Sequence, residues 1–464
     1  AASGKIILDE SYSPTDADND GDIDGPFATG TGRTAIATAG NFTGNITNSG
    51  SITIEGNDSA GIRLGGKLTG NFVHDGKTTV LGDRALGVGL QDVDGNVRLA
   101  GTITAQGVDA VAARIDGNVT GGIILAVPPK DSSSTDNDED DDGIEDAKEG
   151  SALVRSYGAA PAMRIGDTSD AITIGAVAGT GTGFGLVIDG GISGSGVYAG
   201  INANGLQIGG LGGAVTIDGG IGIGATGSVK AASNGASATA IRFGSGATTP
   251  EIRNAGTIEA TGGSSTASTS TALMIEAGAN LGTIRNSGTI SAKAGGNDAT
   301  AIAIVDKSGG VDLVENSGTI SATGALATSD RNVAIDLSAS NTGVIVRQTA
   351  VAATAKAPSI TGDVRFGDGD DIFDIADGSM KGNSSFGSGN NQLKLSGDAA
   401  YTGKAGFGAG ADSVALAGTS VFNGNIEFGG GADMMTLSGT SRFSGSLANS
   451  QGLAVTVSGA TLDV

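Results

Sequence analysis

An all-β solenoid, in which short strands form coils that stack on one another, is the fold class that the sequence predicts. Three observations predict it: internal repeats spaced by roughly 20 to 30 residues, short runs of alternating apolar and polar residues, and 84 Gly against 12 Phe and no Trp. A repeat of this size that holds about three strands and no helix matches one coil of a solenoid.

The first repeated element is the phrase Asn-Ser-Gly-(Ser/Thr)-Ile. It begins at Asn48, Asn286 and Asn316, and a near copy begins at Asn254. A short alternating run follows each copy, as at Ala301-Ile302-Ala303-Ile304. Period-2 alternation bounded by Gly, Asn and Ser indicates strands and turns. We expect each Asn to lie at a turn, where its side chain bonds the backbone or the Asn of the next coil.

The second repeated element is Phe-Gly-x-Gly in the C-terminal part of the chain. Its Phe recurs at a nearly constant interval, at Phe366, Phe386, Phe407 and Phe428. This interval predicts one coil per ~21 residues, with Phe stacked on Phe. A further aromatic position recurs at Tyr401, Phe422 and Phe443. Roughly 15 coils at about 4.8 Å each would give a rod on the order of 70 Å long.

These repeats divide the chain into five segments. Residues 1–44 hold an acidic loop and the first coil, 45–127 are β-helix coils, and 128–150 are an acidic insertion. Residues 151–361 are coils of about 30 residues, and 362–464 are coils of about 21 residues. Insertions into a solenoid form loops on its side and often carry binding function.

The composition excludes several classes of function. The formal charge of −23 disfavours a nucleic-acid partner, because such binding relies on clustered Lys and Arg. Without Cys there is no disulfide, thiolate metal site or cysteine nucleophile. No run approaches the ~20 apolar residues of a membrane-spanning helix, so we expect no such segment.

The acidic insertion carries a predicted calcium site. Carboxylates at positions 1, 3, 5, 9 and 12 of a loop with Gly at position 6 supply the hard oxygen ligands that calcium prefers. The loop resembles those of thrombospondin type 3 repeats, and a solvated acidic loop is the alternative. The predicted ligands are Asp138, Asp140, Asp142, Asp146 and Glu149.

A second calcium site is predicted near the N-terminus. Here Asp alternates with other residues around Gly21, but Phe27 stands where the position-12 acid would be. A flexible acidic loop is the alternative to calcium binding. The predicted ligands are Asp16, Asp18, Asp20, Asp22 and Asp24.

For the other polar residues, the sequence favours a structural role over ion binding or catalysis. Gly367, Gly369 and Asp371 resemble the nonapeptide of RTX toxins, but their much longer repeat favours a Gly-rich turn over an ion site. Four Arg occupy equivalent places in their coils and are expected to form an outward basic stripe with acidic neighbours: Arg63, Arg114, Arg164 and Arg242. The single His, His74, is expected on the surface. No catalytic constellation is present, so an enzyme is not expected.

Together, the Asn-Ser-Gly-Thr-Ile units, the Gly-Asn-Val openings, the acidic insertion and the Phe-Gly-x-Gly-x-Asp coils resemble passenger regions of alphaproteobacterial type V autotransporters. The resemblance covers about Thr34 to Val464 and rests on repeat style. It implies a right-handed parallel β-helix that is secreted across the outer membrane by a C-terminal β-barrel, which would be cleaved or lie outside this chain.

Two hypotheses for the function follow. The first is an extracellular, calcium-stabilised rod that acts as a surface-layer, fibre or adhesin component of the bacterial cell surface. Its expected partners are calcium and either further copies of itself or another cell-surface component. The alternative is a β-helix that binds or degrades polysaccharide. Such enzymes normally carry aromatic platforms, and this chain has no Trp and only 4 Tyr.

Overall fold

The computed structural model describes residues 4–16, 25–129, 145, 150–179, 181–196 and 198–464. In these residues every regular element is a β-strand, and none forms a helix that could span a membrane. The chain divides into two compact units. Unit 1 comprises Ala1–Thr249 and Thr261–Gly263, and unit 2 comprises Pro250–Ala260 and Ser264–Val464.

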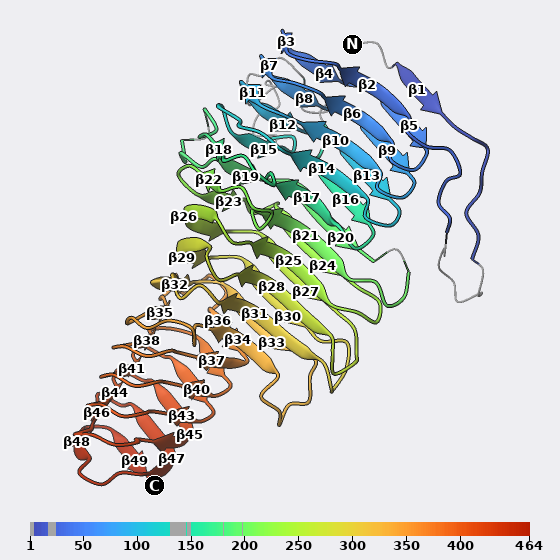
Figure 1. The fold of residues 1–464 in the computed structure, drawn as a ribbon. Helices are drawn as coiled ribbons and strands as arrows, with labels where there is room; N and C mark the ends of the chain where they lie inside the picture. Colours follow the sequence, from blue (N-terminus) through green and yellow to red (C-terminus); the bar gives the residue numbers. More distant parts are fainter. Residues whose placement is uncertain (1–3, 17–24, 130–144, 146–149, 180, 197) are drawn as a thin grey trace. The chain divides into compact units, whose positions relative to one another are not determined.

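Unit 1 consists of parallel strands that stack in columns, as Figure 1 shows. Column 1 holds β1 (Lys5–Leu8), β5 (Ser51–Glu55), β9 (Lys77–Leu81), β13 (Thr102–Gln106), β16 (Leu153–Tyr157), β20 (Gly191–Ser195) and β24 (Ser228–Ala232). Column 2 holds β2 (Thr34–Thr38), β6 (Ala60–Leu64), β10 (Leu86–Leu90), β14 (Val111–Ile115), β17 (Pro161–Ile165), β21 (Ala203–Ile208) and β25 (Ala238–Phe243).

The third side of unit 1 is built from shorter strands. Column 3 holds β4 (Ile46–Asn48), β8 (Phe72–His74), β12 (Val97–Leu99), β15 (Ile123–Leu125), β19 (Leu186–Ile188) and β23 (Ile221–Ile223). Two further sets lie beside it. The first is β3 (Phe42–Thr43), β7 (Leu68–Thr69) and β11 (Val93–Asp94). The second is β18 (Ile172–Ile174), β22 (Val215–Ile217) and β26 (Ala247–Asn254), of which the residues from Pro250 onward belong to unit 2.

Unit 2 repeats the three-column plan. Column 1 holds β27 (Thr257–Thr261), β30 (Thr289–Lys293), β33 (Thr319–Thr323), β36 (Ser359–Thr361), β39 (Ser379–Lys381), β42 (Ala400–Thr402), β45 (Val421–Glu427), β47 (Arg442–Ala448) and β49 (Thr461–Asp463). Column 2 holds β28 (Thr269–Ile275), β31 (Thr300–Asp306), β34 (Asn332–Asp336), β37 (Asp363–Arg365), β40 (Ser384–Ser385) and β43 (Ala405–Gly406). Column 3 holds β29 (Asn280–Asn286), β32 (Leu313–Asn316), β35 (Ile345–Gln348), β38 (Ile372–Ile375), β41 (Gln392–Leu395), β44 (Ser413–Leu416), β46 (Met434–Ser438) and β48 (Ala454–Ser458).

The core of each unit lies inside the three columns. In β5, Ile52 and Ile54 are fully buried while their neighbours are partly exposed, which is the alternation that the sequence pattern predicts. The register aligns Ile52 with Thr78, then Ile103, then Val154, so that equivalent inward side chains stack from coil to coil. The predicted fold class, an all-β parallel β-helix, is therefore confirmed.

The aromatic stacks predicted in the C-terminal coils are present in unit 2. The ring centroids of Phe366 and Phe386 are 4.7 Å apart, and those of Phe386 and Phe407 are 4.6 Å apart. These rings are nearly parallel, at 3° and 6°. A second stack joins Tyr401 to Phe422 over 4.4 Å. Each ring therefore covers its equivalent in the next coil, close to the spacing of adjacent strands.

Candidate functional site

The predicted calcium ligands lie almost entirely outside the described residues. This applies to all five in the insertion, Asp138, Asp140, Asp142, Asp146 and Glu149, and to Asp18, Asp20, Asp22 and Asp24 of the N-terminal loop. Asp16 is described, and it is half-buried between β1 and β2. Within the described part of the chain, no cluster of three or more His, Cys, Asp or Glu is placed to hold a metal. Both calcium sites therefore stay predictions.

A ladder of buried acidic and amide side chains lies at the Phe-Gly-x-Gly turns of unit 2. Asp371, Asn391, Asp412 and Asp433 each precede a strand of column 3, and the register places them one above another. All four are at most 3% exposed. The chain buries them because each turn is covered by an equivalent turn. We call this set the acid ladder.

Backbone amides hold one oxygen of each ladder side chain. The N–H of Asp371 donates to Oδ1 of Asn391 over 3.0 Å, that of Asn391 donates to Oδ1 of Asp412 over 2.8 Å, and that of Asp412 donates to Oδ1 of Asp433 over 3.0 Å. Oδ1 of Asp371 accepts from the N–H of Val344 over 2.8 Å. Every coil of this set is thus tied to the next by the equivalent side chain of that next coil.

The second carboxylate oxygen of two ladder residues, unlike the first, accepts no hydrogen bond from the described residues. Oδ2 of Asp371 and Oδ2 of Asp412 are buried and have no hydrogen-bond partner among the described residues. Burial, with Asp368 and Asp370 nearby, raises the pKa of Asp371 from 3.8 to about 6. Burial raises the pKa of Asp412 as well, and Asp433 adds to this shift. Desolvation disfavours the charged form of a carboxyl, so both groups are perturbed in the direction of the neutral acid.

An uncharged ladder runs through the longer coils of unit 2. Nδ2 of Asn254 donates to Oδ1 of Asn286 over 2.7 Å, and Nδ2 of Asn286 donates to Oδ1 of Asn316 over 2.8 Å. Nδ2 of Asn316 then donates to Oε1 of Gln348 over 3.3 Å. This is the Asn-to-Asn bonding expected from the repeated phrase. Such amide ladders stabilise the stacking of identical coils.

His74 is buried, so the expectation of a surface position is wrong. The side chain is 0% exposed in unit 1, and its Nε2 lies 2.8 Å from Oγ1 of Thr78. Burial lowers the pKa of His74 to about 4. The register places Asn48 in the adjacent coil. Nδ1 of His74 and Nδ2 of Asn48 both lack a hydrogen-bond partner in the part of the chain that is described.

The four Arg identified from the sequence share one outward column on unit 1. Arg63 aligns with Gly89, Gly89 with Arg114, Arg114 with Arg164, and Arg242 follows two coils later across Gln207. Asp116 lies 2.6 Å from Nε of Arg114 and 3.6 Å from Nη2 of Arg164. Burial raises the pKa of Asp116. The positive charge of this Arg column is therefore partly offset by Asp116, an acidic neighbour of the kind that the sequence predicts.

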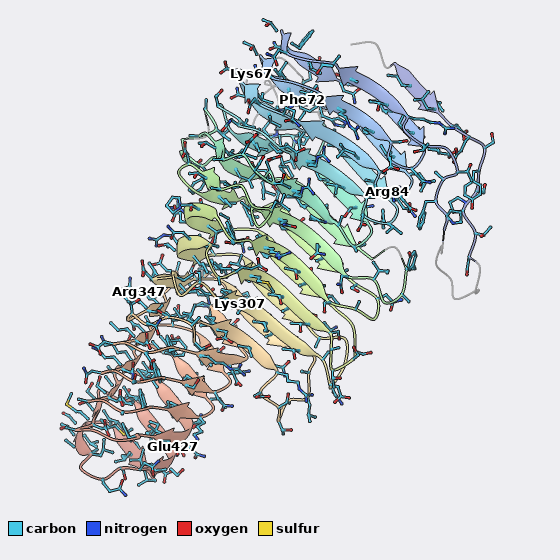
Figure 2. The ribbon with its side chains drawn as sticks, viewed as in Figure 1. Lys67, Phe72, Arg84, Lys307, Arg347 and Glu427 are labelled. Carbon is cyan, nitrogen blue, oxygen red and sulfur yellow. The ribbon has the colours of Figure 1, made fainter. Side chains whose placement is uncertain are left out.

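A second charged column lies on the outer surface of unit 2 and alternates in sign. Oε2 of Glu251 is 3.1 Å from Arg285, Oε1 of Glu315 is 2.7 Å from Arg285, and Oε2 of Glu315 is 3.8 Å from Arg347. Figure 2 labels Arg347 on β35. These pairs are partly exposed, so each contributes little to stability on its own. Their arrangement ties successive coils to one another.

Of the depressions on unit 2, one is lined by several polar side chains and is large enough to hold a small polar molecule. It has a volume of about 450 Å³ and is lined by small and polar side chains, among them Ser329, Asn332, Asp363, Lys381 and Asn383. Burial raises the pKa of Asp363, which also accepts a hydrogen bond from the N–H of Asn383 over 2.8 Å. We call this depression the polar groove. Its lining provides hydrogen-bonding groups.

Comparison with known proteins found no matching family model, no matching curated protein and no matching solved structure. In the described part of the molecule, the buried Asn ladder and the acid ladder serve contacts between coils. Sequence reasoning identified the Asn ladder but not the burial of His74 or of the acid ladder.

Proposed function

We propose that the chain is a secreted, extracellular β-helical structural protein of a bacterial cell surface, acting in a surface layer, a fibre or an adhesin. The observation that carries the proposal is the continuity of its side-chain ladders. Asn254, Asn286 and Asn316 bond in series, and the Phe366 and Phe386 rings stack in the coils that follow. The repeats of the sequence thus serve one purpose, the regular stacking of coils.

Calcium is the proposed stabilising ion, bound by the acidic loops. The spacing of Asp138, Asp140, Asp142, Asp146 and Glu149 around Gly143 supports this part of the proposal. Calcium bound to the folded chain stabilises it by mass action. The proposed partners are calcium and further copies of the chain or another cell-surface component, and the passenger-like repeats support secretion.

Immunogold electron microscopy of intact producing cells tests the location. Gold particles on the outer surface, in a regular lattice or filament that a chelator dissolves, are the expected result. Label confined to the cytoplasm would contradict the proposal. A surface label that is unaffected by chelation would contradict only the calcium part.

Thermal unfolding of the full chain in calcium and in chelator tests the ion directly. We expect a melting temperature several degrees higher in calcium. The variant Asp138→Asn/Asp140→Asn/Asp142→Asn removes the proposed ligands and should lose most of this difference. The matched control, Asp298→Asn/Asp398→Asn/Asp463→Asn, removes the same number of charges elsewhere and should keep it. An equal response from both variants would contradict the assignment to this loop.

Polysaccharide binding is the second candidate, and the polar groove favours it. Hydroxyl, carboxyl and ammonium side chains such as Thr361, Asp363 and Lys381 match the hydrogen-bonding groups of sugars. Binding of the full chain to a panel of immobilised polysaccharides tests this candidate. Binding that is lost in Asp363→Ala but kept in Asp298→Ala would support it, and no binding to any polysaccharide would contradict it.

A further inference from the structure

The acid ladder contains two buried oxygen atoms that the rest of unit 2 does not satisfy. Asp371 is 0% exposed and Asp412 is 1% exposed, yet Oδ2 of each lacks a hydrogen-bond partner among the described residues. A buried ionised oxygen without a partner is costly, because it loses its hydration and gains nothing in return. The ionised form of these two side chains is therefore unfavourable in the folded unit.

The ladder itself shows what kind of group fits there. Asn391 lies between Asp371 and Asp412 in the register, and its Nδ2 occupies the place of their Oδ2. Nδ2 of Asn391 donates to the carbonyl of Gly389 over 3.2 Å and to Oδ1 of Asp412 over 3.1 Å, and it lies 3.5 Å from the carbonyl of Gly387. The position is therefore one for a hydrogen-bond donor that faces acceptors.

An ionised carboxylate oxygen at the same position has no hydrogen atom that it could donate to these acceptors. By the register, Oδ2 of Asp371 and Oδ2 of Asp412 correspond to Nδ2 of Asn391, whose neighbours are hydrogen-bond acceptors. We propose that Asp371 and Asp412 are proton-binding sites of the folded protein. Each Oδ2 binds a proton from mildly acidic solution, and the resulting O–H group donates a hydrogen bond to an acceptor of the ladder.

A proton fits this position better than a metal ion. Calcium needs six to eight oxygen ligands, whereas each turn offers one free carboxylate oxygen and its glycine carbonyls. The described residues hold no group of three or more acidic, His or Cys side chains placed for a metal. Asn391 also fills the equivalent position with an N–H group, which cannot ligate a cation.

The charged groups that act on the two sites are all acidic. Asp368 and Asp370 act on Asp371, and Asp433 acts on Asp412, while Asn391 and the backbone of Val344 add no charge. The pKa of Asp371 is about 6 in the folded unit and 3.8 in its ordinary state. Between pH 4 and pH 6, Asp371 is therefore protonated in the folded unit and ionised in the unfolded chain. Stability from this group is therefore fully present below pH about 4 and is lost as the pH rises through about 6.

Carboxyl titration of the full chain tests the proposal. The protein is labelled with ¹³C at the Asp side-chain carboxyl, and its carbon resonances are followed by NMR from pH 3.5 to 8. We expect two carboxyl resonances that are absent from Asp371→Asn/Asp412→Asn, one from Asp371 that titrates near pH 6 and one from Asp412 that titrates above the ordinary Asp value. Because Asn391 already fits the ladder, this variant should fold. The control Asp368→Asn changes an exposed carboxyl of the same turn and should keep both resonances.

Unfolding equilibria give a second readout. For Asp371 alone, a pKa shift of about two units corresponds to an unfolding constant that rises about 100-fold between pH 4 and pH 7. The double variant should lose this rise. If the two resonances that the double variant lacks titrate at the ordinary Asp value, the proposal is wrong. It is also wrong if calcium raises the melting temperature of the parent chain and the double variant loses that response, because the occupant would then be a cation.

Discussion

Nδ2 of Asn286 donates a hydrogen bond to Oδ1 of Asn316 over 2.8 Å, although the two residues are 30 positions apart in the sequence. Asn286 also accepts a hydrogen bond from Nδ2 of Asn254 over 2.7 Å. One buried amide therefore joins three successive coils. Because amides polarise one another in a chain of hydrogen bonds, the whole ladder stabilises the fold more than the sum of its separate hydrogen bonds.

Removing the middle amide should be strongly destabilising. In Asn286→Ala, the amide of Asn254 loses the shortest of its hydrogen bonds, and the side-chain carbonyl of Asn316 keeps only the N–H of Gly318, both in the core. We expect a loss of about 2–4 kcal/mol in the free energy of unfolding, measured by urea denaturation. Ser287→Ala is the control, because Ser287 is exposed in the same turn. Equal losses for both variants would show that the ladder contributes nothing particular.

The sequence predicts the Asn ladder because the same residue type recurs in the same phrase. Asn254, Asn286 and Asn316 lie at equal places in coils of similar length, so their stacking can be inferred without coordinates. The column that contains His74 offers no such signal. Asn48, His74 and Leu99 are three different residues that only the register brings into line.

The acid ladder shows a second limit of sequence reasoning. Asp371 and Asp412 stand in Gly-rich turns, where polar side chains normally face solvent. Their burial arises from the turns of the coils before and after them, which the local sequence does not reveal. The stacking of Phe366 on Phe386 is predictable, by contrast, because the same aromatic residue returns at the same place in each coil.

The stacked Phe rings make a second prediction. Phe386 lies between Phe366 and Phe407, with centroids 4.7 and 4.6 Å away. Phe386→Ala removes both contacts and leaves a cavity, so we expect a loss of about 3–5 kcal/mol in the free energy of unfolding. Urea denaturation measures it. Phe42→Ala is the matched control, because Phe42 is 42% exposed, and it should cost far less. If the two variants were equally stable, stacking would not stabilise these coils.

Glycine stacking makes a third prediction. Gly403 has φ +147°, and a Cβ on it would lie 1.9 Å from the carbonyl oxygen of Gly382 in the coil before. Gly403→Ala therefore combines backbone strain with a clash that no side-chain rotation relieves. We expect a loss of about 2–4 kcal/mol. A Cβ on Gly430 would meet nothing within 4 Å, so Gly430→Ala should change stability by less than about 0.5 kcal/mol. Thermal unfolding compares the two, and a reversed order would contradict the close approach of these coils.

His74 makes the last prediction, and its sign is opposite to that of the acid ladder. Its folded pKa of about 4 lies below the ordinary 6.5, so the unfolded chain binds the proton more readily between these values. Stability from a neutral His74 is fully present above pH 6.5 and is lost as the pH falls toward 4. The shift of about 2.5 units corresponds to about 3 kcal/mol.

A single imidazole makes this loss directly measurable. Because the chain has 1 His, its imidazole proton resonance reports His74 alone, and we expect it to remain that of the neutral ring down to about pH 5. His74→Asn places an amide over Asn48 and extends that column without a titrating group. In urea denaturation, the parent chain should lose about 3 kcal/mol more than His74→Asn between pH 7 and pH 4. An imidazole that titrates near pH 6.5 in the folded chain would show that the ring of His74 is accessible to water. The buried position of His74 against Thr78 would then be wrong.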